Sequence, residues 1–89
     1  MRLSDDEVRT RLAALGGWSL QDGRLRRRYA LPSFAEALAF VNRVGALAEA
    51  ADHHPDILVE YRHVTLTLST HDAGGLTAKD FALAAQIDA

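Results

Sequence analysis

Three of the four histidines fall within two short polar segments, Asp52-His53-His54-Pro55 and Ser69-Thr70-His71-Asp72. Imidazole has an unperturbed pKa of about 6.5, so it can accept or donate a proton near neutral pH. A small chain with several imidazoles in two such segments has the groups needed for acid–base catalysis or for binding a metal ion. The fourth histidine, His63, falls in an expected turn between strands and is interpreted as a surface residue.

The first polar segment follows the longest predicted helix. Helices are predicted to begin after Ser4, Ser33 and Thr77, because each of these residues is followed three positions later by Glu or Asp, the pattern of a capping box. Pro55 requires the second helix to end near residues 52–53, since the residue before proline avoids helical dihedral angles. The apolar stripe of that helix is expected to consist of Phe34, Leu38, Val41, Val44, Ala48 and Ala51.

The second polar segment follows the last predicted strand. Residues 18–20 and 25–31 are predicted to form one hairpin around Asp22-Gly23, and residues 57–61 and 64–70 a second one around Arg62-His63. The last strand alternates apolar and polar residues, which predicts one face on the core and places His71 on the polar face. We expect a single α+β domain over residues 1–89: a four-stranded antiparallel sheet with helices packed on one face, in the order αββαββα.

Composition narrows the classes of function. The 48% hydrophobic and 25% charged residues are ordinary for a globular protein, and the net charge of −2 favours neither nucleic acid nor an anionic membrane as partner. The chain has no cysteine, so disulfides and thiolate chemistry are excluded. No apolar run approaches the length of a membrane span, and the N-terminal residues lack the apolar core of a signal peptide. The cytoplasm is the expected location.

A longer pattern includes both histidine segments. Trp18 is followed by His53-His54-Pro55, then Thr70-His71, Gly75-Leu76-Thr77 and Asp80. In these residues and in its length the chain resembles the pterin-4a-carbinolamine dehydratases. The resemblance implies a hydro-lyase that removes water from 4a-hydroxytetrahydropterin in tetrahydrobiopterin recycling and yields quinonoid dihydropterin. It implies no metal and no organic cofactor, a small pterin as substrate, and a homodimer or homotetramer.

The resemblance also suggests site residues. His53, His54, His71 and Asp80 are the expected catalytic residues, with His53 and His71 at the reacting centre and His54 mainly orienting the pterin. Asp80 is either a partner of a histidine or only the capping residue of the last helix. The substrate is expected to contact Asp52, His53, His54, Pro55, Ser69, Thr70, His71 and Asp72. Where many members of the family have tryptophan, this chain has Ile57.

Three other functions fit parts of the pattern. His53, His54 and His71 could bind zinc, although their spacing matches no common zinc motif. A dehydratase-like protein could also act in another pterin pathway, including molybdopterin metabolism. Finally, a domain of this kind could serve as a non-catalytic dimerisation module, in which case the histidines would be replaceable.

Overall fold

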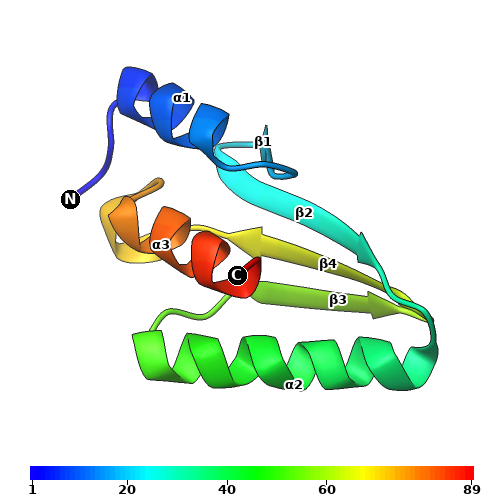
Figure 1. Cartoon of the computed structure of the whole chain (residues 1–89). Helices are drawn as coiled ribbons and strands as arrows, with labels where there is room; N and C mark the ends of the chain where they lie inside the picture. Colours follow the sequence, from blue (N-terminus) through cyan, green and yellow to red (C-terminus); the bar gives the residue numbers. More distant parts are fainter.

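A twisted antiparallel sheet of four strands in the order β1-β2-β4-β3 forms the centre of the molecule (Figure 1). The structure is a computed structural model that describes residues 1–89. Its elements are α1 (Asp5–Ala14), β1 (Ser19–Gln21), β2 (Arg24–Ala30), α2 (Phe34–Ala51), β3 (Asp56–Glu60), β4 (His63–Leu68), the short 3-10 helix η1 (His71–Ala73) and α3 (Ala78–Ile87). The expected α+β fold with the order αββαββα is confirmed.

The two hairpins differ in how well their turns were predicted. Asp22 and Gly23 form the first turn, both with positive φ, as an Asp-Gly hairpin turn requires. The second turn was expected at Arg62-His63 and instead consists of Tyr61 and Arg62, with a φ of 55° at Tyr61. His63 is therefore the first residue of β4, where it pairs with Glu60. The prediction was wrong by one residue because the apolar run alone does not locate the turn.

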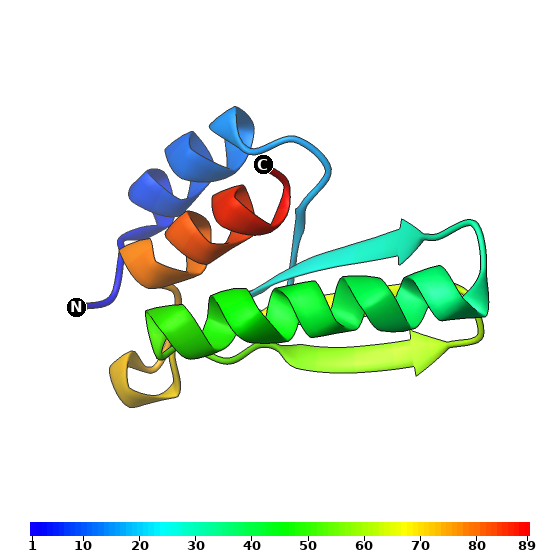
Figure 2. The same cartoon turned by 60° about the horizontal axis from the view of Figure 1, so that its bottom comes forward.

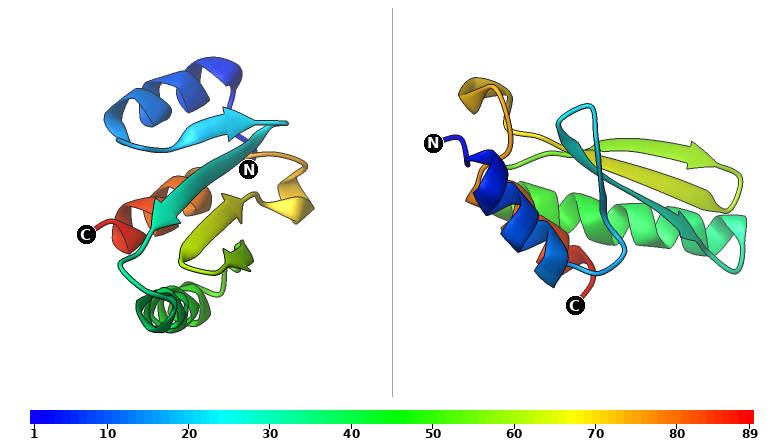
Figure 3. Two further views of the ribbon diagram at one scale, coloured as in Figure 1. Left: turned by 90° about the vertical axis from the view of Figure 1, so that its right-hand side faces the viewer. Right: turned by 90° about the horizontal axis from the view of Figure 1, so that it is seen from above.

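One face of the sheet packs against the helices, and the opposite face carries no α-helix (Figure 3). Leu25 of β2 and Leu66 and Leu68 of β4 point from the sheet into the core and are fully buried. Val44 of α2 and Leu83 of α3 belong to the same buried cluster. Burying such apolar side chains supplies most of the driving force for folding, at roughly 25 cal/mol per Å² of apolar surface.

The face that α2 turns toward the core differs from the expected stripe. Val44 and Ala48 are buried as predicted, but Phe34, Leu38 and Ala51 are exposed. Ala37 is buried in their place, and Phe40 and Leu47 are packed partly against the core. Helix α2 has apolar residues on two adjoining faces, and packing against β4 and α3 selects one of them.

The helix caps confirm most of the local predictions. Ser4 with Glu7 and Thr77 with Asp80 form complete capping boxes at the starts of α1 and α3. At the start of α2, Ser33 accepts a hydrogen bond from the amide of Glu36, without a return bond from the Glu36 side chain. None of the helices has the combination of length and hydropathy needed to span a bilayer.

Candidate active site

Four segments that carry the predicted site residues meet at one end of the molecule. The C-terminal end of α2, the end of β4, η1 and the N-terminal end of α3 all lie at this end (Figures 1 and 2). The tight end of α2 makes this possible. Asp52 adopts left-handed dihedral angles with φ 49°, and the amide of His53 donates to the carbonyl of Ala48 over 3.0 Å. The chain then leaves α2 toward α3 and β3 instead of continuing as a helix.

His53 and Asp80 form a buried pair. The Nε2 atom of His53 lies 2.6 Å from Oδ1 of Asp80. Asp80 is 0% exposed and His53 is 9% exposed. A buried carboxylate is stable only when it is paired and hydrogen-bonded, so these contacts account for the presence of a charge in the core.

Two further donors complete the hydrogen bonding of the Asp80 carboxylate. Its second oxygen, Oδ2, accepts hydrogen bonds from the Thr70 hydroxyl over 2.8 Å and from the Thr77 amide over 2.9 Å. The hydroxyls of Thr70 and Thr77 also lie 2.9 Å apart. The sequence left open whether Asp80 caps α3 or holds a histidine. The structure shows that one carboxylate does both, with a different oxygen for each contact.

The pairing leaves the other ring nitrogen of His53 free. Every buried side-chain nitrogen or oxygen in the structure has a hydrogen-bond partner. The Nδ1 atom of His53 has no such partner within the chain, so it is not fully buried. A carboxylate at Nε2 favours the tautomer that carries its proton on Nε2, which leaves a lone pair on Nδ1. His53 therefore presents a proton-accepting nitrogen to the surface from a ring that is fixed at its back.

His54 points away from this pair. It is exposed, and its Nε2 contacts Oε2 of Glu49, which lies about one turn earlier on α2. Glu49 is exposed, yet it holds this ring. Adjacent residues in extended chain point to opposite sides, which explains why the two neighbouring histidines have different partners.

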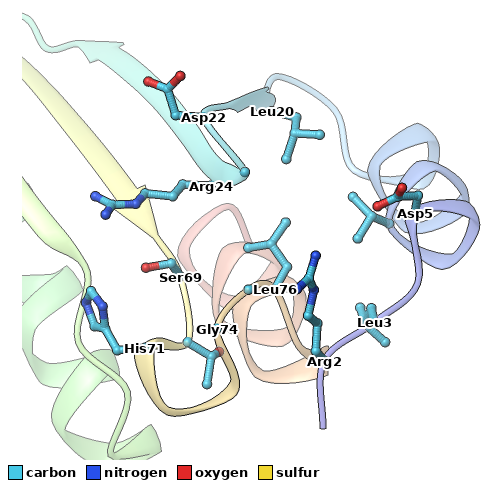
Figure 4. A pocket seen from close by; sticks show the side chains of 14 residues that line it. Arg2, Leu3, Asp5, Leu20, Asp22, Arg24, Ser69, His71, Gly74 and Leu76 are labelled. Atoms are coloured by element: carbon cyan, nitrogen blue, oxygen red, sulfur yellow. The ribbon is translucent and has the colours of Figure 1, made fainter.

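His71 lies in a small loop that β4 makes before α3. Thr70 and Gly75 form an isolated antiparallel bridge, and η1 lies between them. His71 is exposed at the start of η1 and lines a cavity of about 360 Å³ together with Ser69 and Thr70 (Figure 4). The polar face predicted for β4 thus continues into a hollow surface.

The remaining predicted residues surround this end of the molecule. Asp52 is exposed at the end of α2, and Pro55 is half-buried before β3. Asp72 lines a second hollow, next to Thr70 and Thr77. No group of three or more His, Cys, Asp or Glu side chains has a geometry that could hold a metal ion. The structure thus joins His53, Thr70 and Asp80 by direct contacts, pairs His54 with Glu49, and places His71 on the cavity wall.

Some lining residues were not expected from the sequence. Arg2 and Arg24 line the same cavity as His71. The position of Arg24 could have been found from strand register, because Leu25 pairs with Leu68 and the next step places Arg24 opposite Ser69. Arg2 lies in the segment before α1 and has no such local signal.

This fold and this arrangement of histidines define a class of small α+β proteins, and comparison with known proteins identifies the family. The family model for pterin 4 alpha carbinolamine dehydratase matches residues 1–89. A relative from Roseiflexus sp. strain RS-1 is 60% identical over 87 residues, which cover 98% of this chain and 94% of the relative. A relative from Chloroflexus aurantiacus strain J-10-fl is 55% identical over 87 residues, again 98% of this chain and 94% of the relative. Both carry the provisional name pterin-4-alpha-carbinolamine dehydratase. The chain belongs to the pterin-4a-carbinolamine dehydratase family.

Two solved structures share the fold. The crystal structure of a transcriptional coactivator/pterin dehydratase from Brucella melitensis matches with a TM-score of 0.94 and 32% identity, covering 99% of this chain and 96% of the other. A pterin dehydratase-like protein described as a RuBisCO assembly factor in the alpha-carboxysome matches with a TM-score of 0.70 and 29% identity, covering 81% of this chain and 86% of the other. The same fold therefore occurs in proteins with different described roles.

Proposed function

We propose that this protein is a hydro-lyase that converts 4a-hydroxytetrahydropterin to quinonoid dihydropterin and water, as a step in tetrahydrobiopterin recycling. The observation that carries the proposal is the buried His53–Asp80 pair, whose outer ring nitrogen has no partner within the chain. The pair lies where α2 ends, at the same end of the molecule as η1 (Figure 1). Membership of the dehydratase family and a relative that is 60% identical support it.

The reaction needs two proton transfers. The hydroxyl on C4a must receive a proton, because water leaves far more readily than hydroxide. The proton on N5 must be removed as the C4a–O bond breaks and the C4a=N5 double bond forms. One neutral and one protonated imidazole satisfy this balance, and each well-placed acid or base contributes about 10²–10⁴-fold to the rate.

In this proposal His53 is the base. Its Nδ1 takes the N5 proton, and the ring then carries a positive charge that faces the Asp80 carboxylate 2.6 Å away. A buried carboxylate behind an imidazole stabilises the imidazolium and holds the ring in orientation, as in other acid–base sites. Thr70 and the Thr77 amide hold Asp80 in turn, so the base is supported through two successive contacts.

His71 supplies the proton to the departing hydroxyl, and proton exchange with solvent restores both rings. Its exposed position on the cavity wall allows that exchange. His54, held by Glu49, contacts the pterin from the other side. Asp52, Pro55, Ser69, Thr70 and Asp72 contribute backbone and side-chain groups to the edge of the pterin ring. In this scheme the chain uses no metal and no organic cofactor.

The test is a stopped-flow measurement of dehydration. 4a-hydroxytetrahydropterin is generated in the mixing chamber, and its ultraviolet decay is followed with the wild-type protein, H53Q, H71Q and H63Q. His63 is the matched control because it is a histidine in β4 outside the site. We expect the wild-type rate to exceed the spontaneous one clearly. H53Q and H71Q should each lose about 10²-fold of the enzymatic rate, and H63Q none.

The outcomes separate the alternatives. A wild-type rate no faster than spontaneous decay would rule out the dehydratase and favour the non-catalytic module. Full activity in both H53Q and H71Q would be consistent with the proposed reaction but would contradict catalysis by these two histidines. Circular dichroism of each variant shows whether the fold is intact, so a loss of rate can be assigned to the missing imidazole.

We further propose that the chain forms a homodimer or homotetramer. The support is apolar surface on an open edge of the sheet and on α2. Leu58 of the edge strand β3 is 50% exposed and Phe34 of α2 is 48% exposed. An exposed edge strand with apolar side chains is a template for pairing with another chain. Light scattering should show an oligomer that L58D weakens and that Q21D, on the opposite edge strand β1, leaves intact. A monomeric wild-type protein would contradict the proposal.

The cytoplasmic location expected from the sequence is part of the same proposal. Reduced pterins are easily oxidised, so a reducing compartment suits the proposed substrate. Fractionation of cells that express the chain, with detection in the membrane and soluble fractions, tests the location.

A further inference from the structure

The cavity beside His71 contains two guanidinium groups that have no partner. Arg2 and Arg24 line it together with His71, Ser69 and Thr70. Neither guanidinium takes part in any of the ion pairs or side-chain hydrogen bonds of the structure. Unpaired guanidiniums in a concave surface are favourable positions for an anion, because their planar donors match a phosphate or carboxylate.

Arg24 is placed by the sheet. It is the first residue of β2, and continuation of the register from the Leu25–Leu68 pair sets it opposite Ser69. In Figure 4 the guanidinium of Arg24, the hydroxyl of Ser69 and the ring of His71 extend to the same side of the end of β4. A ligand that reaches His71 would therefore pass next to Arg24.

Arg2 is placed by the segment before α1. The amide of Leu3 donates to the carbonyl of Leu76 over 2.8 Å, which ties this segment to the loop after η1. The side chain of Arg2 then lies across Gly75, where an added Cβ would come within 2.9 Å of its Nε. Gly75 is thus a position where the absence of a side chain makes room for this arginine.

Two carboxylates also line the cavity, and their positions decide which part of it attracts an anion. Asp22 lies in the β1–β2 turn and points away from Ser69 and His71, while Asp5, the first residue of α1, lies on the opposite side of the cavity, nearer to Arg2 (Figure 4). The side of the cavity formed by Arg24, Ser69 and His71 has no carboxylate on its wall. The positive charge is therefore concentrated next to the proposed acid–base site.

We infer that this cavity binds an anionic group at the end of the substrate's side chain, with Arg24 as the contact and with Arg2, on the other side of the cavity, adding only the longer-range attraction of its charge. The substrate class is then a reduced pterin whose side chain ends in a phosphate or carboxylate, in preference to one with a neutral side chain such as that of tetrahydrobiopterin. The inference keeps the dehydration of the proposed function and changes the pterin that undergoes it. The cavity volume of about 360 Å³ leaves room for a short side chain with such a group. This inference rests on the proposed function, because it assumes that the pterin ring lies among the histidines.

The experiment compares two stable pterins that differ only in the charged group. Neopterin has a neutral trihydroxypropyl chain, and neopterin 3′-monophosphate has the same chain with a terminal phosphate. Their dissociation constants are measured by pterin fluorescence at constant ionic strength for the wild-type protein, R24Q, R2Q and R28Q. Arg28 is the matched control, because it lies on the same face of β2 as Arg24 but does not line the cavity. Inorganic phosphate and acetate are used as competitors to compare the two kinds of anion.

We expect the phosphate compound to bind about tenfold more tightly than neopterin, the size of one favourable charged contact of 1.4 kcal/mol. R24Q should remove most of this difference, R2Q a smaller part, and R28Q none. Stronger competition by inorganic phosphate than by acetate would assign the site to phosphate, and the reverse would assign it to carboxylate.

Two results would overturn the inference while the proposed function stands. One is equal affinity of both pterins for the wild-type protein. The other is an equal loss in R24Q and R28Q, which would indicate general charge attraction. Failure of both pterins to bind, together with no dehydration in the stopped-flow assay, would instead overturn the proposed function and this inference with it.

Discussion

Helix α3 has a carboxylate near each end that is held by distant side chains, and the two differ in what holds them. Asp80, in the first turn, is fully buried and contacts His53, Thr70 and the amide of Thr77. Asp88, just after the helix, is partly exposed. It accepts hydrogen bonds from three side chains: Trp18 over 2.7 Å, Arg27 over 3.1 Å and Tyr29 over 2.6 Å.

The difference shows how one kind of side chain serves two purposes. The partners of Asp88 keep their protons at neutral pH, since arginine stays charged and an indole does not ionise. Burial, and after it the hydrogen bond to Asp88, raises the pKa of Tyr29 far above its usual range. Asp88 therefore only ties α3 to β2 and to Trp18, the residue before β1. The partner of Asp80 is an imidazole, which can change its charge near neutral pH, so that end of α3 can take part in proton transfer.

The largest expected effect comes from removing the charge at Asp80. D80A leaves His53, Thr70 and the Thr77 amide without their common acceptor, and should lower the free energy of unfolding by about 3–5 kcal/mol. D80N preserves the size of the side chain and should reduce the dehydration rate by about 10²-fold. Urea unfolding and the stopped-flow assay measure the two effects. An active D80N protein would show that the carboxylate is only a helix cap.

The matching substitution at the other end should affect stability alone. D88N weakens contacts to Arg27, Trp18 and Tyr29 and is expected to cost about 1–3 kcal/mol, the range for hydrogen bonds to a charged group. The dehydration rate should remain that of the wild-type protein, because this carboxylate contacts no histidine. A clear loss of rate in D88N, with the fold intact by circular dichroism, would contradict the division between the two ends.

A smaller change tests the support behind His53. T70V removes one donor to Asp80 while keeping the shape of the side chain, and should cost about 1 kcal/mol. T67V is the control, because it makes the same change in β4 at a threonine whose side chain makes no hydrogen bond in the structure. If T70V and T67V are equally stable and equally active, the Thr70–Asp80 contact does not contribute.

The smallest effect should appear only in alkaline solution. Because folding raises the pKa of Tyr29, the protonated phenol stabilises the fold fully below the unfolded pKa of about 10. This contribution declines as the pH rises from that value toward the folded pKa. The stability difference between the wild-type protein and Y29F should therefore shrink above about pH 10. Urea unfolding of both proteins across this range measures it, and a constant difference would mean that burial and the contact with Asp88 do not raise the pKa of Tyr29 on folding.

Local sequence signals predicted the contacts of Asp80, at the start of α3, better than those of Asp88, after its end. Thr77 and Asp80 form a recognisable capping box, and the histidine segments pointed to the same region of the fold. The partners of Asp88 are separated from it by 59 to 70 positions in the chain. No helix or strand pattern connects residues so far apart, so this cluster could not be found before the sheet and α3 were assembled. The same limit applies to Arg2 at the cavity.

The error in the predicted apolar stripe of α2, half of which is exposed, has a related cause. Phe34 and Leu38 satisfy the helical periodicity as well as Ala37 and Val44 do, and the hydrophobic pattern alone does not rank the two faces. Contact with β4 and α3 made the choice. The one-residue error at the second hairpin has the same cause. The apolar alternation in the following strand is the same whether the turn lies at residues 61–62 or at residues 62–63.

The sequence by itself determined the order of the elements, the ends of the helices, the histidine segments and the resemblance to a family. These features depend on neighbouring residues, through caps, turns and periodicity. Only the tertiary structure decided which nitrogen of His53 is held, that both oxygens of Asp80 are used, and which arginines share a cavity with His71. These are contacts between residues far apart in the chain, and their geometry exists only once the helices are packed on the sheet.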